Sequence, residues 1–217
     1  MPTTLSSDPA QIPIDLVHPI RRPDAFDDPD WIFEPMYDGL RGLLQSSSTG
    51  CEIRMIGDVQ LDRLTDLCER VHAVLNGREA ILDGEIVALD RAGRPVLRDL
   101  IAGRGAAAFA AFDLIQLDGQ DLRVLPLGER KRKLVDLLPR DTGPLYKILT
   151  IEEYGRALFE ATRKLDLEGI VAKRKGDTYG PAAKWYSIRN PTYYRVSNPA
   201  SRTSPAPVTK RARSEAR

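Results

Sequence analysis

The stretch Ala80-Ile-Leu-Asp-Gly-Glu-Ile-Val-Ala-Leu-Asp90 decides how this chain folds. It is an apolar run of the length of a buried strand, yet it carries Asp83 and Glu85 in its middle. Isolated charges are costly to bury in such a strand, so each of them requires a partner or a ligand. A turn signal at Ala92-Gly93 ends the run. The stretch therefore predicts a central strand that carries a charged site.

Other extended segments lie on both sides of this strand. Asp118-Gly119 stands between two apolar runs, which is the strongest short signal for a β-hairpin. The loop Ser46–Gly50 joins two runs in the same way. Strands or extended segments are expected at 31–35, 40–45, 51–56, 80–90, 110–117, 121–124, 169–173 and 184–189.

Three helices interrupt the strands. Apolar residues recur at helical spacing from Gln60 to Leu75, and a second helix is expected from Glu129 to Leu138, where Pro139 stops it. Thr150-Ile-Glu-Glu153 reads as a capping box that opens a third helix, which continues to Leu165. The order of elements is that of an antiparallel α+β fold and does not alternate as in βαβ units.

The composition is that of a soluble chain with one sizeable core. Of the 217 residues, 42% are apolar and 29% are charged, and no run of apolar residues is long enough to span a membrane. We expect a disordered N-terminus at 1–10, one domain at 11–195, a disordered basic tail at 196–217 and a cytoplasmic location. The tail carries a net charge of +4, whereas the whole chain carries +1, so the remaining residues are mildly acidic. The tail is either a solvated end or a patch for DNA.

Cys51 and Cys68 lie 17 positions apart and lack the spacing of metal ligands. We expect two buried thiols in a reducing compartment.

Four short stretches place charges in or beside apolar strands. They are Glu34-Pro-Met-Tyr-Asp-Gly-Leu-Arg41, Asp83-Gly-Glu85, Glu168-Gly-Ile-Val-Ala-Lys173 and Trp185-Tyr-Ser-Ile-Arg189. Each has an ordinary explanation on its own. Asp83-Gly84 could be a hairpin turn, Glu168-Gly169 a helix C-cap, and Glu34 with Arg41 a surface ion pair.

Together, in this order and spacing, the stretches resemble the ATP-dependent DNA ligase family, particularly the bacterial repair ligases. The family's first motif, Glu-x-Lys-x-Asp-Gly-x-Arg, corresponds to residues 34–41, with Met36 at the position of the lysine. The resemblance also includes Asp83-Gly-Glu85, Phe112-Asp113 and residues 168–173, and it covers about 19–194. It implies two antiparallel β-sheets with flanking helices, an ATP-grasp-like adenylation domain. The small OB-fold domain that follows in the family has no room in the remaining residues.

The resemblance also implies a role for each matched residue. Phe112 would stack on adenine, Glu34 would hold the adenosine, and Arg41 would grip ribose or phosphate oxygens. Glu85 and Glu168 would bind Mg²⁺. Lys173 would place a cation on the α-phosphate of ATP or AMP, and Arg189 would lie near it. Glu85 would also contribute to nucleotide binding.

The chain departs from the family pattern at several positions. Met36 removes the lysine that would attack ATP, since a thioether cannot form a stable link to phosphorus. Ser187 replaces the first lysine of the last motif, and only Arg54-Met-Ile-Gly57 stands where Ser-Arg-x-Gly is usual. Met36 could be a single substitution in a working enzyme. The several losses together favour a degenerate relative that is defective in the first chemical step.

Two classes of function follow from these observations. The first is a ligase-like domain that binds ATP or AMP and Mg²⁺ and acts weakly on nicked or adenylylated DNA. The second is a non-catalytic nucleotide- or DNA-binding accessory protein with a partner in bacterial DNA repair. An RNA ligase or capping-type relative fits the wording of the motifs less well.

Overall fold

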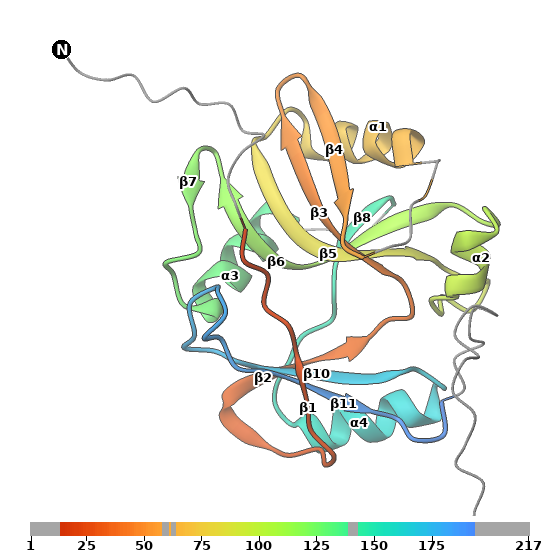
Figure 1. Cartoon of the computed structure of the whole chain (residues 1–217), viewed down its shortest axis with the longest axis vertical. Coiled ribbons are helices and arrows are strands. Elements are labelled where there is room, and N and C mark those ends of the chain that lie inside the picture. The colour runs from red at the N-terminus through yellow and green to blue at the C-terminus, as the bar shows by residue number, and fades with distance from the viewer. Residues whose placement is uncertain (1–13, 58–60, 62–63, 139–142, 194–217) are drawn as a thin grey trace, which may run out of the picture.

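The computed structural model describes residues 14–57, 61, 64–138 and 143–193. Two β-sheets face each other, and the helices lie against them (Figure 1). The predicted α+β fold of two sheets with flanking helices is confirmed. Among the described residues, no separate β-barrel accompanies the two sheets.

The larger sheet has the strand order β4-β3-β5-β6-β7, and β8 pairs with β6. Its members are β3 (Leu40–Ser47), β4 (Gly50–Met55), β5 (Ala80–Ala88), β6 (Ala107–Leu117), β7 (Gln120–Asp121) and β8 (Leu145–Lys147). The quoted stretch is therefore the middle strand, β5. Both hairpin turns predicted from sequence are present, and Asp118 and Gly119 adopt φ values of 47° and 79° at the second.

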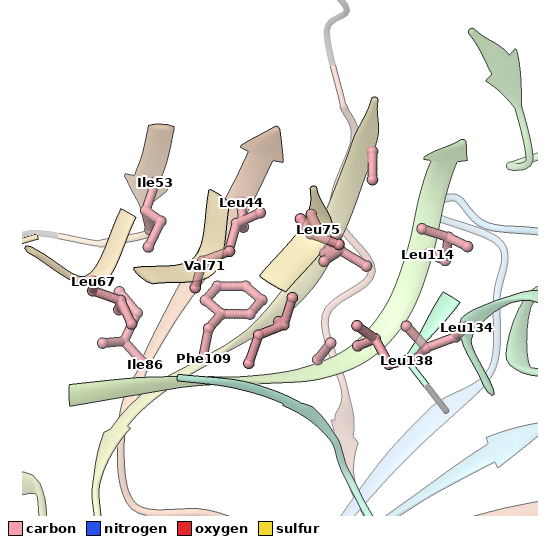
Figure 2. Close-up of a cluster of buried hydrophobic side chains, with 14 of the residues drawn as sticks. Leu44, Ile53, Leu67, Val71, Leu75, Ile86, Phe109, Leu114, Leu134 and Leu138 are labelled. Carbon is pink, nitrogen blue, oxygen red and sulfur yellow. The ribbon is translucent and has the colours of Figure 1, made fainter. Parts of the chain in front are cut away.

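Helices α1 (Leu64–Leu75), α2 (Leu97–Ile101) and α3 (Leu127–Leu137) cover the outer face of this sheet. Leu67, Val71 and Leu134 lie there in one buried cluster with Phe109 of β6 (Figure 2). Phe109 also explains why position 84 is glycine. A Cβ atom there would lie 2.3 Å from a ring carbon of Phe109. The glycine thus lets a ring lie directly on the backbone of β5.

The smaller sheet has the order β1-β11-β10-β2-β9. Its members are β1 (Ile20–Arg21), β2 (Asp28–Met36), β9 (Ile151–Glu153), β10 (Gly169–Arg174) and β11 (Trp185–Arg189), and helix α4 (Gly155–Lys164) packs against it. Most neighbouring strands in the two sheets are antiparallel, as predicted. The pairs β1–β11 and β6–β8 are parallel, a departure from the antiparallel expectation.

The predicted capping box at Thr150–Glu153 is wrong. Ile151–Glu153 forms strand β9, which pairs with β2, and α4 begins only at Gly155. The hydroxyl of Thr150 donates a hydrogen bond to Glu34, 3.2 Å away, instead of capping a helix. Long-range strand pairing has overridden a local signal, because backbone bonds to β2 satisfy the donors that a cap would have served.

The boundaries of the other predicted helices agree with the structure within a few residues. The helix expected at 60–75 is α1, and residues 58–60 and 62–63 lie outside the described part of the chain. The segments expected to be disordered, 1–10 and 196–217, also lie outside it, as does Pro139. The division into a domain at 11–195 and two tails therefore stays a prediction. None of the described helices combines the length and the apolar character needed to cross a membrane.

The described chain passes between the two sheets at two places. Residues 37–39 lead from β2 to β3, and residues 148–150 lead from β8 to β9. A third group of apolar residues fills the space between the sheets, and it includes Ile81, Phe112, Ile148 and Trp185. The inward faces of both sheets are therefore packed together around the segments that connect them.

Candidate functional site

A cavity of about 280 Å³ opens beside this inter-sheet core. All eight residues that the sequence singled out for a site line it: Glu34, Met36, Arg41, Glu85, Phe112, Glu168, Lys173 and Arg189. Seven of them come from six strands of the two sheets, and Glu168 directly precedes β10. Convergence of residues so far apart in the sequence is what a functional site requires and what separate surface pairs would not produce.

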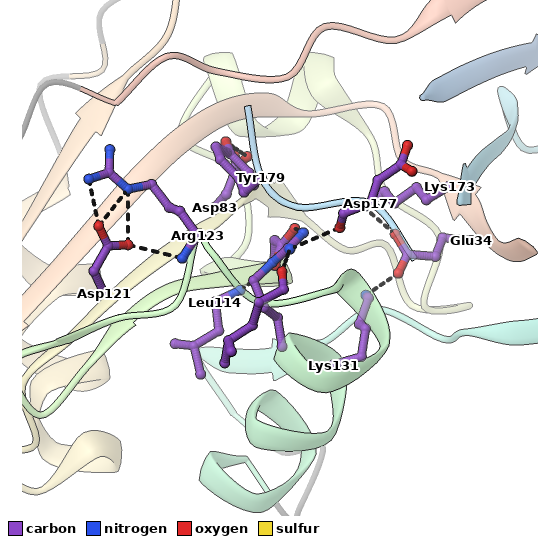
Figure 3. Close-up of polar contacts among 12 residues, drawn as sticks. Glu34, Asp83, Leu114, Asp121, Arg123, Lys131, Lys173, Asp177 and Tyr179 are labelled. Atoms are coloured by element: carbon purple, nitrogen blue, oxygen red, sulfur yellow. Dashed lines mark hydrogen bonds and ion pairs between the residues drawn. The ribbon is translucent and has the colours of Figure 1, made fainter. Parts of the chain in front are cut away.

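Glu34 lies at the bottom of the cavity and is 2% exposed. Two lysines contact its carboxylate: Lys173 of β10, with Nζ 2.6 Å from Oε2, and Lys131 of α3, which contacts Oε1 (Figure 3). Thr150 donates to the same oxygen as Lys131. Burial alone would raise the pKa of Glu34, but the two ammonium groups outweigh it and hold that pKa below its ordinary value. Glu34 is thus an ionised carboxylate.

Lys173 is the one buried amine among the described residues that lies between two aromatic faces. Its Nζ is 4.2 Å from the ring centre of Phe112 and 4.0 Å from that of Trp185. Burial lowers the pKa of Lys173 to about 8, against the attraction of Glu34 and with the help of Lys131. The ammonium forms the ion pair with Glu34 but makes no hydrogen bond of regular geometry in the described structure. The N–H groups that do not face Glu34 are therefore available to an anionic ligand.

A β-bulge positions Phe112. Asp83 pairs with Asp113 and Gly84 with Ala111, so Phe112 is the extra residue of β6 at that point. A bulge bends a strand and re-aims the side chain that it carries. The ring of Phe112 therefore points between the sheets, while Asp113 points to α3 and accepts two hydrogen bonds from the buried Arg130, at 2.8 and 2.9 Å.

The guanidinium of Arg41 is already hydrogen-bonded to other groups of the protein. Its guanidinium donates to both oxygens of Asp83, at 3.0 and 2.6 Å, and to the carbonyl of Val17 at 2.7 Å. Tyr179 donates a further bond of 2.6 Å to Asp83 (Figure 3). Burial opposes the charge on Arg41, but Asp83 outweighs it and raises the pKa of Arg41 above its ordinary value. Arg41 lines the cavity, yet most of its donors already have acceptors.

The two carboxylates suited to a metal ion also line the cavity. Glu168 is 5% exposed and lies 3.0 Å from the guanidinium of Arg189. Glu85 is on β5, across the cleft. No group of three or more His, Cys, Asp and Glu residues in the described structure could hold a metal on its own. Two carboxylates nevertheless fit Mg²⁺, which commonly takes one or two of them and completes its shell with phosphate oxygens and water.

Met36 occupies the last position of β2, where it pairs with Gly169 of β10. It lines the same cavity as Lys173 and is half-buried. Ser187 also lines it, whereas Arg54 lies exposed on β4. The motif positions are thus assembled in the fold, and what differs is the chemistry of their side chains.

The ordinary explanations of the charged stretches fail in the structure. Asp83-Gly84 lies inside β5 and not in a turn. Gly169 begins strand β10 and caps no helix, since α4 ends at Lys164. The partners of Glu34 are lysines and that of Arg41 is Asp83, so the two residues do not form a surface pair.

Sequence reasoning missed Lys131 and Thr150 as partners of Glu34, and Tyr179 as a partner of Asp83. No local pattern could have found them, because each lies 96 or more positions from its partner. The predicted burial of the cysteines is also incorrect, since both remain partly exposed.

A larger groove of about 740 Å³ runs along α3 on the other side of Glu34. It shares Ile148 with the cavity but is lined by none of the eight predicted site residues. Its lysines and acids largely balance, as in the contact of 3.0 Å between Lys175 and Glu152. We regard the smaller cavity as the candidate site because its charges are buried and convergent.

Comparison with solved structures identifies the fold as that of a DNA ligase adenylation domain. The mycobacterial DNA ligase D complexed with ATP and MES superposes with a TM-score of 0.67 at 27% identity, over 82% of this chain and 60% of that one. An ATP-dependent DNA ligase from bacteriophage T7 in complex with ATP shares the fold at 17% identity, with a TM-score of 0.52.

The family model of the ATP dependent DNA ligase domain matches residues 22–189. The chain therefore belongs to the ATP-dependent DNA ligase family. It is 37% identical, over 159 residues, to the multifunctional non-homologous end joining protein LigD of Pseudomonas aeruginosa, covering 69% of this chain but only 19% of that protein. It is 28% identical to the SPbeta prophage-derived DNA ligase-like protein LigB of Bacillus subtilis, over 83% of this chain and 68% of LigB. The chain thus spans about a fifth of the LigD protein that it matches.

Proposed function

We propose that this chain is a nucleotidyltransferase-type domain of DNA repair that binds ATP or AMP without forming a covalent link to it. The supporting observation is the position of Met36. It lies at the end of β2 and lines the same cavity as Lys173 and Phe112. By its resemblance to the family's first motif, this position would be that of the attacking lysine. The remaining groups form a nucleotide-sized cavity around a side chain that has no N–H.

The chemistry of the side chain argues against self-adenylylation. Attack of a lysine amine on the α-phosphate releases pyrophosphate and a proton and leaves a neutral nitrogen bound to phosphorus. Attack by the thioether of Met36 would leave a positively charged sulfur that has no proton to lose. Water would readily hydrolyse the bond between this sulfur and phosphorus. A covalent intermediate therefore has no stable form at position 36.

The other cavity residues have suitable properties for noncovalent binding. Adenine would lie against Phe112, and the ammonium of Lys173 would move from the ring face towards the phosphate. Arg189 would lie near the same phosphate. Glu34, which keeps its charge between two lysines, would accept hydrogen bonds from the adenosine. Arg41, tied to Asp83, would support the wall of the cavity more than it would bind phosphate.

Glu85 and Glu168 would hold Mg²⁺ together with phosphate oxygens, and the ion would neutralise charge on the phosphates. Release of Glu168 from Arg189 would be part of this binding. Both residues line the cavity, which supports this assignment.

One catalytic step would remain open to such a domain. On a nick that already carries a 5′-adenylate, the 3′-hydroxyl attacks the 5′-phosphorus and AMP leaves, and no lysine nucleophile takes part. The alternative is a non-catalytic accessory protein that binds a nucleotide or DNA for a repair partner. Similarity to proteins named for non-homologous end joining supports a repair setting for both.

The deciding experiment is incubation with ATP labelled in its α-phosphate and Mg²⁺, followed by a denaturing gel. We expect no label on the wild-type chain and labelled protein from Met36→Lys, alone or with Ser187→Lys. Label retained by the wild type would refute the proposed defect. Equilibrium dialysis of the same protein with AMP tests noncovalent binding. Nicked DNA with a preformed 5′-adenylate then separates a residual ligase, which seals it, from an accessory protein, which does not.

A further inference from the structure

The two cysteines of the chain meet on the face of the larger sheet that lies away from the cavity. Cys51 belongs to β4 and Cys68 to α1, and both pack against the same hydrophobic core while remaining partly exposed. Because side chains alternate along a strand, Cys51 points to the same face as Ile53. Strand β4 and helix α1 are in direct contact, and Figure 2 shows Ile53 of β4 and Leu67, the neighbour of Cys68 on α1, in the same buried cluster.

The two thiols are in hydrogen-bond contact. The S–H group of Cys51 donates to the sulfur of Cys68, which is the main reason why the pKa of Cys68 is lowered and that of Cys51 is raised. Burial opposes the lowering at Cys68, while the backbone N–H of Ile53 adds to it. The directions of the two shifts favour the thiolate on Cys68, with the thiol of Cys51 beside it. A thiolate next to a second thiol is the arrangement of a redox-active pair.

We propose that Cys51 and Cys68 form a reversible intramolecular disulfide on exposure to peroxide, which ties the edge strand β4 to helix α1. This proposal rests on the placement of the two thiols and is independent of the proposed nucleotide binding. It needs no other cysteine, since the chain has only these two.

The reaction balances with hydrogen peroxide as the oxidant. The Cys68 thiolate attacks one peroxide oxygen, the O–O bond breaks, and the departing hydroxide takes up a proton to become water. This step leaves a sulfenic acid on Cys68. The sulfur of Cys51 then attacks that of Cys68, an S–S bond forms, the S–O bond breaks, and the hydroxyl leaves as water with the proton of Cys51. Two thiols and one peroxide yield one disulfide and two waters.

The disulfide would restrain one edge of the sheet. β4 is the terminal strand of the larger sheet, and just beyond its end the N–H of Ile56 donates to the carbonyl of Arg41 at the cavity wall. A bond between residues 51 and 68 closes a loop of moderate length. Such a closure restricts the unfolded chain, and we expect it to raise the melting temperature by about 5 °C or more.

The test uses the full-length chain, reduced and freed of reductant, then treated with one equivalent of hydrogen peroxide. Free thiols are alkylated under denaturing conditions, and peptides are analysed by mass spectrometry. We expect a peptide that links Cys51 to Cys68, its disappearance on adding dithiothreitol, and a higher melting temperature of the oxidised monomer. Sulfinic acid on either cysteine without the linked peptide, or disulfide-linked dimers only, would overturn the proposal.

Two variants separate the roles of the two thiols. In Cys51→Ser, Cys68 should form a sulfenic acid that dimedone traps, because the second thiol is absent. In Cys68→Ser, Cys51 should react with peroxide at least about tenfold more slowly, because its burial and the nearby Glu52 still disfavour its thiolate. Equal peroxide reactivity of the two variants would contradict the assignment of Cys68 as the attacking sulfur. Melting curves of the reduced variants check that both fold.

Discussion

The two walls of the cleft satisfy their buried charges in different ways. On the larger sheet, Asp83 and Asp113 each meet one guanidinium through two hydrogen bonds, so both of these buried carboxylates have a geometrically matched partner. On the smaller sheet, a single carboxylate, Glu34, faces the two amines of Lys131 and Lys173. The charges of the two aspartates are therefore neutralised within the protein. The second wall has a surplus of positive charge, which a phosphate would neutralise.

The largest effect on stability is expected when a buried ion pair of the larger sheet is broken. Asp113→Ala leaves Arg130, only 1% exposed, as an unpaired buried cation and should lower the free energy of unfolding by about 3–5 kcal/mol, as measured by urea denaturation. The control is Asp121→Ala, which breaks the partly exposed pair with Arg123 and should cost at most about 1 kcal/mol. Equal losses from the two variants would mean that burial does not distinguish them.

The opposite wall should respond in binding rather than in stability. Lys173→Met removes one of two amines, and Glu34 keeps Lys131. We therefore expect ATP or AMP to bind about 10–100-fold more weakly, the equivalent of losing a charged hydrogen bond, with little change in unfolding free energy. Lys175→Met is the matched control, since Lys175 pairs with Glu152 outside the cavity. Calorimetric titration would show whether affinity falls for Lys173→Met alone.

A smaller effect is expected from Tyr179→Phe. The substitution removes one hydrogen bond to Asp83, which keeps both bonds from Arg41, and should lower the unfolding free energy by about 1–2 kcal/mol. AMP affinity should stay unchanged. A large loss of affinity would show that Tyr179 acts on the ligand and not only on the wall.

The last prediction concerns the dependence of stability and affinity on pH. The pKa of Lys173 is about 8 in the folded chain and ordinarily 10.5. Between these values the unfolded chain binds more protons, so this group makes stability rise with pH from about 8 to 10.5. AMP affinity should instead fall a few-fold as pH rises through this pKa, because the neutral amine no longer attracts phosphate. Both trends should vanish in Lys173→Met, as measured by calorimetry and urea denaturation across this range.

Prediction from the sequence succeeded where local patterns reflect the final environment. The apolar run of β5 and the Asp118-Gly119 turn predict a strand and a hairpin of the larger sheet from local residues alone. The site residues were found because the motifs keep their order and spacing. The bulge at Phe112, the role of Thr150 and the contact between Cys51 and Cys68 were not predictable, because each is decided by a strand or helix distant in the sequence.

The two segments that connect the sheets differ in their freedom to turn. At 37–39, a Cβ on Gly39 would meet the carbonyl oxygen of Ile86 at 2.5 Å, and Tyr193 donates to Asp38, so this segment is clamped on both sides. The segment at 148–150 is held less tightly, and Leu149 within it is 56% exposed. If the two sheets move apart to admit a ligand, backbone rotation should be concentrated around Leu149. The segment 37–39, next to Met36, should keep its conformation.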